Sequence, residues 1–203
     1  NSGTLTNVGT LSVSSGRTLT LNSATLTQGE GATLDGNGGR IQLNSSTLNL
    51  GAGDFHTAAV ALGVSTSTIN GPGHLVNDGA LELAHSTVNA ALDNRGSLLA
   101  RGNVSINGAL STAAGSEIVV RGDQFVGGSS LTVANGFINA GRIELTSAWS
   151  GYGEALNVSS GVLLNDTTGR IESTVGTGGG RTLNAQLDNR GTLLVDQGLV
   201  LSR

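Results

Sequence analysis

The stretch Leu75-Val76-Asn77-Asp78-Gly79-Ala80-Leu81-Glu82-Leu83 decides the fold. It consists of an apolar residue, any residue, Asn, any residue and Gly, followed by apolar residues at alternate positions. The same phrase returns at 5–13, 92–98, 137–145 and 187–195. A phrase that recurs through a chain indicates one structural unit that is stacked many times.

Two copies of this phrase match closely over a longer stretch. Residues 88–99 and residues 183–194 are identical at nine of twelve positions. Between such phrases, short segments alternate apolar and polar residues, as in Leu19-Thr20-Leu21 and Ile41-Gln42-Leu43. This period of two predicts strands of three to five residues with one buried face. Gly, Asn, Asp and Ser separate the strands, and these residues favour turns.

A β-sandwich and a stack of coils both fit short strands with frequent turns. Hairpin signals are few, and aromatic residues are only 2% of the chain, which favours a stack filled by Leu, Val, Ile and Ala. We therefore predict an all-β solenoid over residues 1–203 as one domain, with loops at its corners. At roughly 20 to 25 residues per coil, it would have about nine coils.

Within each phrase, the apolar residues after Gly are expected to point into the core, whereas Asn and Gly form a corner. We expect positive φ at the glycine and hydrogen-bonded stacks of Asn along the rod. The corner positions predicted in this way are Asn7, Gly9, Asn77, Gly79, Asn94, Gly96, Asn139, Gly141, Asn189 and Gly191.

The composition limits the function classes. The chain has 203 residues, 33 Gly, 1 Pro, no Cys and no Met, and its formal net charge is −4. Without Cys, disulfides and thiol chemistry are excluded. Weak acidity disfavours nucleic acid as a partner, because phosphate neutralisation needs a basic stripe. No apolar run is long enough for a membrane span. His56, His74 and His85 match no metal-ligand spacing, so we expect no metal and no cofactor.

The phrases Leu187-Asp188-Asn189-Arg190-Gly191-Thr192-Leu193 and Ile138-Asn139-Ala140-Gly141-Arg142-Ile143-Glu144-Leu145 resemble the coil repeats of filamentous-haemagglutinin-like exoproteins. These are bacterial surface adhesins exported by two-partner secretion, and autotransporter passenger domains are similar in composition. The resemblance implies a right-handed parallel β-helix, secretion or display on the bacterial surface, and an outer-membrane secretion partner. It also implies that the chain is a shaft segment of a larger protein, because the Asn-Pro-Asn motifs of the family's secretion domain do not occur.

Two segments are candidates for contact with a receptor, matrix protein or glycan. Arg121-Gly122-Asp123 is a tripeptide that integrins recognise in adhesins, provided that it lies at an exposed turn; a plain turn is the competing interpretation. Trp149 and Tyr152 share a Gly-rich segment, where they would contact a glycan or partner, or else cover the edge of the core. A further loop is expected at 51–56.

The predicted function is therefore that of a non-catalytic, extracellular shaft that presents loops for adhesion. The alternative is a module that binds or degrades polysaccharide, although the acidic residues are scattered and most read as turn residues. A minor alternative is an ice-binding solenoid. Thr-X-Thr triplets begin at Thr4, Thr18, Thr25 and Thr66, but their irregular spacing in the sequence counts against a regular face.

Overall fold

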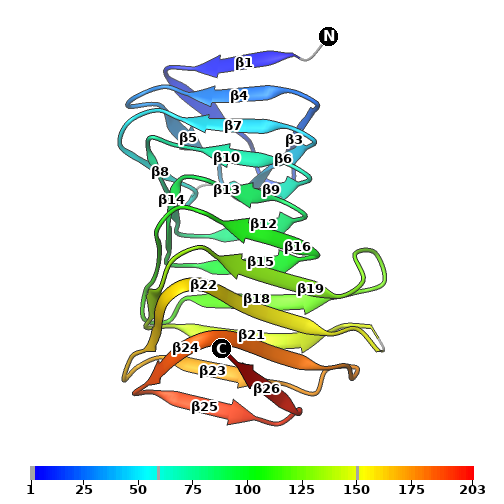
Figure 1. Cartoon of the computed structure of the whole chain (residues 1–203). Helices are drawn as coiled ribbons and strands as arrows, with labels where there is room; N and C mark the ends of the chain where they lie inside the picture. The colour runs from blue at the N-terminus through cyan, green and yellow to red at the C-terminus, as the bar shows by residue number, and fades with distance from the viewer. Residues whose placement is uncertain (1–2, 59, 150) are drawn as a thin grey trace.

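The computed structural model describes residues 3–58, 60–149 and 151–203 and shows a rod of stacked coils (Figure 1). Strands of successive coils pair in parallel, and the described residues contain no helix. The predicted parallel β-solenoid of about nine coils is thus confirmed. Each coil contributes strands to three faces of the rod. The sheets that form these faces are labelled A to D.

Sheet A forms the first face and extends along the whole rod. In spatial order its strands are β1 (Thr4–Asn7), β4 (Thr25–Gln28), β7 (Thr47–Leu50), β10 (Thr68–Asn70), β13 (Thr87–Val88), β16 (Asn103–Ile106), β19 (Ser129–Val133), β22 (Glu154–Asn165), β24 (Arg181–Asn189) and β26 (Leu199–Ser202). From β4 to β16 the register is continuous between neighbours, so residues at equivalent positions form straight columns along this part of the rod.

The second face begins with sheet B, which pairs β2 (Thr10–Ser12) with β5 (Thr33–Asp35). It continues as sheet D, which contains β8 (Asp54–His56), β11 (His74–Asn77), β14 (Ala91–Asn94) and β17 (Leu110–Thr112). Further along, β20 (Phe137–Asn139) pairs with the second half of β22, which pairs with the second half of β24. The long strands β22 and β24 therefore pass around a corner and serve two faces.

Sheet C forms the third face, again along the whole rod. Its strands are β3 (Thr18–Asn22), β6 (Gly39–Asn44), β9 (Val60–Ser65), β12 (Ala80–Ala84), β15 (Ser97–Arg101), β18 (Glu117–Gly122), β21 (Arg142–Ser147), β23 (Arg170–Ser173) and β25 (Thr192–Val195). Its outward side chains carry several ion pairs, for example Arg40 with Glu82 and Arg142 with Glu144.

The core consists of apolar columns that the three faces direct inward. On sheet A, Leu26, Leu48, Ile69 and Val88 lie in register and are each at most 1% exposed. The alternating pattern produces this arrangement, since every second side chain of a strand points to the same side. Burial of one such side chain contributes about 1.5–3 kcal/mol, so the columns are the main stabilising element.

The predicted Asn stack is confirmed on the corner that follows the second face. The Asn77 amide donates to Asn94 (2.7 Å), Asn139 donates to Asn165 (2.9 Å), and Asn165 donates to Asn189 (2.7 Å). All but Asn189 are fully buried. Thr replaces Asn in two coils and continues the stack, where Thr57 and Thr112 donate to the next Asn, at 3.1 Å in both cases.

The expectation of positive φ at the glycine of each phrase was wrong. Positive φ occurs elsewhere, whereas Gly9, Gly79, Gly96, Gly141 and Gly191 have ordinary values. Glycine is needed in most of these phrases because coils approach closely. A Cβ at Gly96 would lie 2.2 Å from the carbonyl oxygen of Gly79, and one at Gly141 would lie 2.4 Å from that of Ser116. At these glycines the backbones of neighbouring coils are therefore in direct contact.

Positive φ marks instead the corner between sheets C and A, which we call the C–A corner. Ser23, Ser45, Thr66 and His85 occupy it in successive coils, each with φ of 49°. The residue after this turn is often a buried Ser that accepts a backbone N–H from the coil before: Ala24 N–H donates to Ser46 (3.0 Å), Ser46 N–H to Ser67 (2.8 Å), and Ser67 N–H to Ser86 (3.1 Å). Compact corners of this kind keep the early coils short.

Extra residues enter the later coils mainly at the C–A corner. Asn89 and Asn107 are hydrogen-bonded one coil apart and separated by 18 residues. Gly102 and Ser129 are likewise one coil apart but separated by 27 residues, since a loop is inserted after β18. The loop expected at 51–56 is only partly present, because residues 54–56 form β8 and pair with β11.

Candidate functional site

The most distinctive surface of the rod is formed by three loops at the C–A corner of successive later coils. These corner loops are residues 123–128 after β18, 148–149 and 151–153 after β21, and 174–180 after β23. Figure 1 shows the first as a projection at the right of the rod. Because they follow consecutive strands of sheet C, the loops lie one above another.

Each corner loop exposes one large apolar side chain. Phe125 is 80% exposed, Trp149 is 50% exposed and Val175 is 52% exposed. Tyr152 differs, since it is half-buried and lies against the first loop, where a Cβ at Gly127 would be 3.8 Å from its ring. The two predicted aromatic residues therefore separate: Tyr152 packs inside the loop cluster, whereas Trp149 projects from it.

Backbone hydrogen bonds join the three loops to one another. Ser129 N–H donates to the carbonyl of Gly153 at 3.1 Å, Glu154 N–H donates to that of Gly180 at 3.0 Å, and Thr177 N–H donates to that of Ser147 at 3.0 Å. The first loop also closes on itself, as Asp123 and Gly127 exchange two backbone hydrogen bonds of 2.8 and 3.0 Å. The exposed side chains are thus carried on a connected backbone.

Asp123 fixes the first loop from inside. Its carboxylate accepts hydrogen bonds from the N–H groups of Phe125 (2.8 Å) and Val126 (3.2 Å) and pairs with Arg101 at 2.5 Å. Burial alone would raise the pKa of Asp123, but these hydrogen bonds and the charge of Arg101 outweigh it and lower that pKa. The carboxylate therefore stays ionised and holds the loop that presents Phe125.

The same contacts bear on the Arg121-Gly122-Asp123 tripeptide. Arg121 lies half-buried within β18, Gly122 is buried, and Asp123 is only 9% exposed. An integrin-type contact requires a free carboxylate at an exposed tip, and this tripeptide does not form one. Its Asp has the structural role just described.

A buried ion pair beneath the loops was not anticipated from the sequence. The side chains of Glu154 and Arg181 form a salt bridge with no exposed surface. Arg181 also donates to the carbonyls of Leu145 (3.1 Å), Thr174 (3.1 Å) and Val175 (3.2 Å), and Glu154 accepts from Gly122 N–H (3.2 Å). The pair therefore ties all three loops to the rod. In the sequence, Arg181 comes directly after a Gly-rich run, and no pattern around it indicates a buried side chain.

Burial changes the ionisation of Glu154. Desolvation raises the pKa of Glu154 to about 7, and the opposing effects of Arg181 and Gly122 N–H reduce that rise without cancelling it. Next to the pair, a groove of about 290 Å³ runs along the foot of the loops, with Gly128, Ser130, Gly153, Glu154 and Thr182 in its wall. Its wall is mostly glycine and hydroxyl groups, which leaves backbone atoms accessible.

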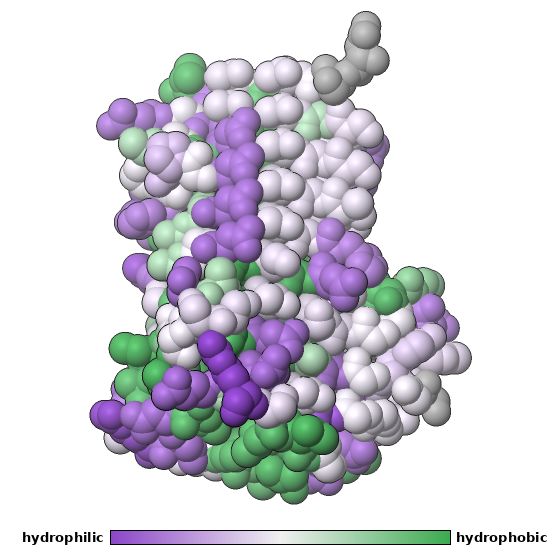
Figure 2. Space-filling view, viewed as in Figure 1, coloured by the Kyte–Doolittle hydropathy of each residue, from purple (hydrophilic) through white to green (hydrophobic). Residues whose placement is uncertain are grey.

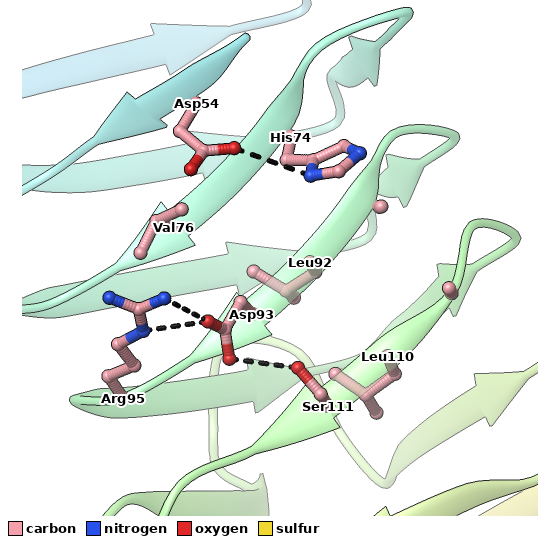
Figure 3. Close-up of a pocket in the computed structure, with 10 residues that line it drawn as sticks. Asp54, His74, Val76, Leu92, Asp93, Arg95, Leu110 and Ser111 are labelled. Atoms are coloured by element: carbon pink, nitrogen blue, oxygen red, sulfur yellow. Dashed lines mark hydrogen bonds and ion pairs between the residues drawn. The ribbon is translucent and has the colours of Figure 1, made fainter.

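A second concavity, also of about 290 Å³, lies on sheet D (Figure 3). Its floor is apolar and includes Val76, Leu92 and Leu110. Polar side chains surround this floor as pairs: His74 lies 3.3 Å from Asp54, and Asp93 binds Arg95 at 2.6 Å.

The hydrogen-bonded side chains around this concavity limit the chemistry that it can perform. Ser111 donates to Asp93 at 2.8 Å, so its hydroxyl is directed to a carboxylate and not to a histidine that would activate it as a nucleophile. Among the described residues, no three His, Asp or Glu side chains are grouped to hold a metal ion. The concavity can offer hydrogen bonds to a small polar group above an apolar floor.

Comparison of the chain with protein-family models, with curated proteins and with solved structures finds no match. In the part of the chain that the structure describes, no helix is long and apolar enough to cross a membrane. The fold and the geometry of these surfaces are therefore the basis for the functional argument.

Proposed function

We propose that this chain is a non-catalytic β-solenoid shaft of a secreted bacterial surface adhesin, of the filamentous-haemagglutinin-like kind, and that its corner loops contact a protein partner on a host cell or in the extracellular matrix. The proposal includes an outer-membrane secretion partner, because the resemblance of the repeats to those of filamentous-haemagglutinin-like exoproteins implies one. The observation that carries the proposal is the exposure of Phe125, Trp149 and Val175 on interlinked loops.

The physical argument is one of preorganisation. Large apolar side chains on a soluble surface are typical of interaction sites when they cluster, and aromatic residues dominate the binding energy of protein interfaces. Asp123 and the Glu154–Arg181 pair hold the loops before any partner arrives. Binding then costs less conformational entropy than it would for a loose loop.

A protein partner is favoured over a glycan by the mixture of side chains. Sugar rings stack on aromatic faces, and only Phe125 and Trp149 could offer these, whereas Val175 suits an apolar patch on a protein. A glycan remains the alternative, with the groove beside Ser130 and Gly153 as the place where hydroxyl groups would bind.

The test measures binding of the purified chain to cultured epithelial cells and to matrix-coated surfaces. We expect the double variant Phe125→Ala, Trp149→Ala to lose most of the binding. The matched control is Val8→Ala, because Val8 is 77% exposed and lies outside the loops. A soluble Arg-Gly-Asp peptide should not compete.

Equal binding by the double variant and the wild type would disprove the role of the loops. Binding to a glycan array that the double variant loses would favour the glycan alternative. Turnover of an acidic polysaccharide by the wild type would contradict a non-catalytic function.

A further inference from the structure

The outer face of sheet A over the first six coils is a regular array of short polar side chains. One column consists of Thr4, Thr25, Thr47, Thr68, Thr87 and Ser105, which pair in register from strand to strand. The column beside it consists of Thr6, Thr27, Asn49, Asn70, Asn89 and Asn107. We call this surface the threonine face. The irregular spacing of Thr in the sequence thus conceals a regular spacing in space, because corner insertions do not disturb the columns.

The threonine face has a repeat in two directions. Neighbouring strands of a sheet lie ~4.8 Å apart, and outward side chains on one strand recur every two residues, at ~6.6 Å. Figure 2 shows the face in the upper half of the rod as an even, pale surface with one hydrophilic stripe. Ordered water in ice repeats in two dimensions on the same scale.

Its side chains are held in place before anything binds. Amide hydrogen bonds of 2.8–3.1 Å join Asn49, Asn70, Asn89 and Asn107 into one line. Threonine is stiff at χ1 because it is β-branched. Thr47, Thr68 and Thr87 alternate with the buried Leu48, Ile69 and Val88, so their half-buried side chains lie on the outer side of the sheet. A Thr hydroxyl can both donate and accept a hydrogen bond, as water does.

The chemistry of the face disfavours two other classes of ligand. The six strands β1, β4, β7, β10, β13 and β16 contain no charged residue and no aromatic residue. Anionic polymers and lipids need a positively charged surface, and stacked sugar rings need aromatic side chains. A flat, uncharged and periodic partner fits instead.

We propose that the threonine face binds ice, with the Thr hydroxyls and methyls ordering a layer of water that joins the crystal lattice. This inference is independent of the corner loops, because the loops follow β18, β21 and β23 of sheet C, whereas the threonine face is carried by the strands of sheet A. Its occupant is an ice surface; a second copy of the same face is the competing occupant, and the test separates the two.

The test measures inhibition of ice recrystallisation and partitioning of the purified chain into a slowly growing ice hemisphere. The wild type is expected to inhibit recrystallisation and to enter the ice. Thr68→Tyr, in the middle of the face, should lose both activities, because a bulky ring prevents flat contact. Thr20→Tyr is the matched control: Thr20 is exposed on sheet C and should tolerate the change.

Circular dichroism and thermal unfolding show whether each variant is folded. If Thr68→Tyr does not fold, the milder variant Thr68→Ser takes its place, and it should weaken the ice activity. Exclusion of the wild type from ice, as for an inert protein, would overturn the proposal. Equal loss in Thr20→Tyr and Thr68→Tyr would also overturn it. A wild-type dimer that Thr68→Tyr dissociates, without ice activity, would assign the face to a second copy.

Discussion

The side-chain amide of Asn77 donates a 2.7 Å hydrogen bond to Oδ1 of Asn94 one coil further on, and neither side chain is exposed to solvent. The same amide also reaches the carbonyl of Ser97 at 3.0 Å. Asn94 in turn donates to the carbonyl of Glu117 at 2.9 Å. The two buried amides together therefore satisfy polar groups in three successive coils, which makes the stack a structural requirement of the rod.

Asn94→Ala should destabilise the fold by about 2–3 kcal/mol, because it removes an acceptor from the buried amide of Asn77 and the donor that Asn94 supplies to the Glu117 carbonyl. Chemical denaturation monitored by circular dichroism measures the loss. Asn89→Ala is the control, since Asn89 belongs to the exposed line on sheet A and its loss should cost about 0.5 kcal/mol. Equal costs for both variants would contradict the role of burial.

Gly96→Ala should destabilise the rod by about 1–3 kcal/mol, as overpacking does in a core. The reason is the close approach of coils, since the added Cβ would lie 2.2 Å from the Gly79 carbonyl oxygen. Gly79→Ala tests the same phrase one coil earlier, where the nearest atom would be 3.5 Å away. Thermal unfolding should rank Gly79→Ala near the wild type; if both glycines tolerate Ala, close approach does not explain their recurrence.

Because the pKa of Glu154 is raised, we expect the folded protein to become less stable as pH rises. The pKa of Glu154 is raised to about 7 in the folded protein from 4.5. The folded state therefore binds more protons than the unfolded state between these values, and the free energy of unfolding decreases as pH rises through this window. Melting temperatures recorded from pH 5 to pH 8 should show this decline.

Glu154→Gln removes the titrating group and keeps its shape, so its melting temperature should change less over the same pH window. Asp123 does not obscure the result, because its lowered pKa makes its contribution vanish only in more acidic solution. A wild type and a Glu154→Gln variant with parallel pH profiles would show that Glu154 does not titrate in this range.

Asp123→Ala should open the first corner loop. The variant loses the hydrogen bonds from Phe125 and Val126 and the pair with Arg101, which together hold residues 123–128. Trypsin should then cleave after Arg121 faster than in the wild type, where Arg121 lies within β18. Cleavage rates followed by mass spectrometry check this, and Asp196→Ala, outside the corner loops, should leave the rate after Arg121 unchanged.

The fold was predictable because its determinants are local. Alternation of apolar residues in segments such as 41–43 fixes which side chains enter the core, and the Asn-X-Gly phrase marks one corner in the coils that contain it. The reason for glycine was not predictable, since the close approach of Gly96 to Gly79 exists only after stacking. The irregular sequence spacing of the Thr-X-Thr triplets likewise concealed the column that contains Thr4, Thr25 and Thr68, because coil length varies while register does not.

The loop cluster was predictable only in part. The Gly-rich segment around Trp149 and Tyr152 indicated a loop, and a loop is present. The sequence could not indicate that Asp123 faces inward, since this depends on Arg101 in the preceding coil. Nor could it indicate the burial of Arg181, whose partner Glu154 is separated from it by a full coil.

The C–A corner has a practical consequence for protein engineering. Because this corner accommodates a tight serine turn in one coil and a loop of several residues in another, without a change in the columns on either side, it is a natural insertion point for foreign peptides. A peptide grafted between Arg101 and Asn103, or in place of residues 124–126, would be displayed at a chosen height on a stiff support. The coil chosen for the insertion would then set the position of the peptide along the rod, in steps of one strand spacing.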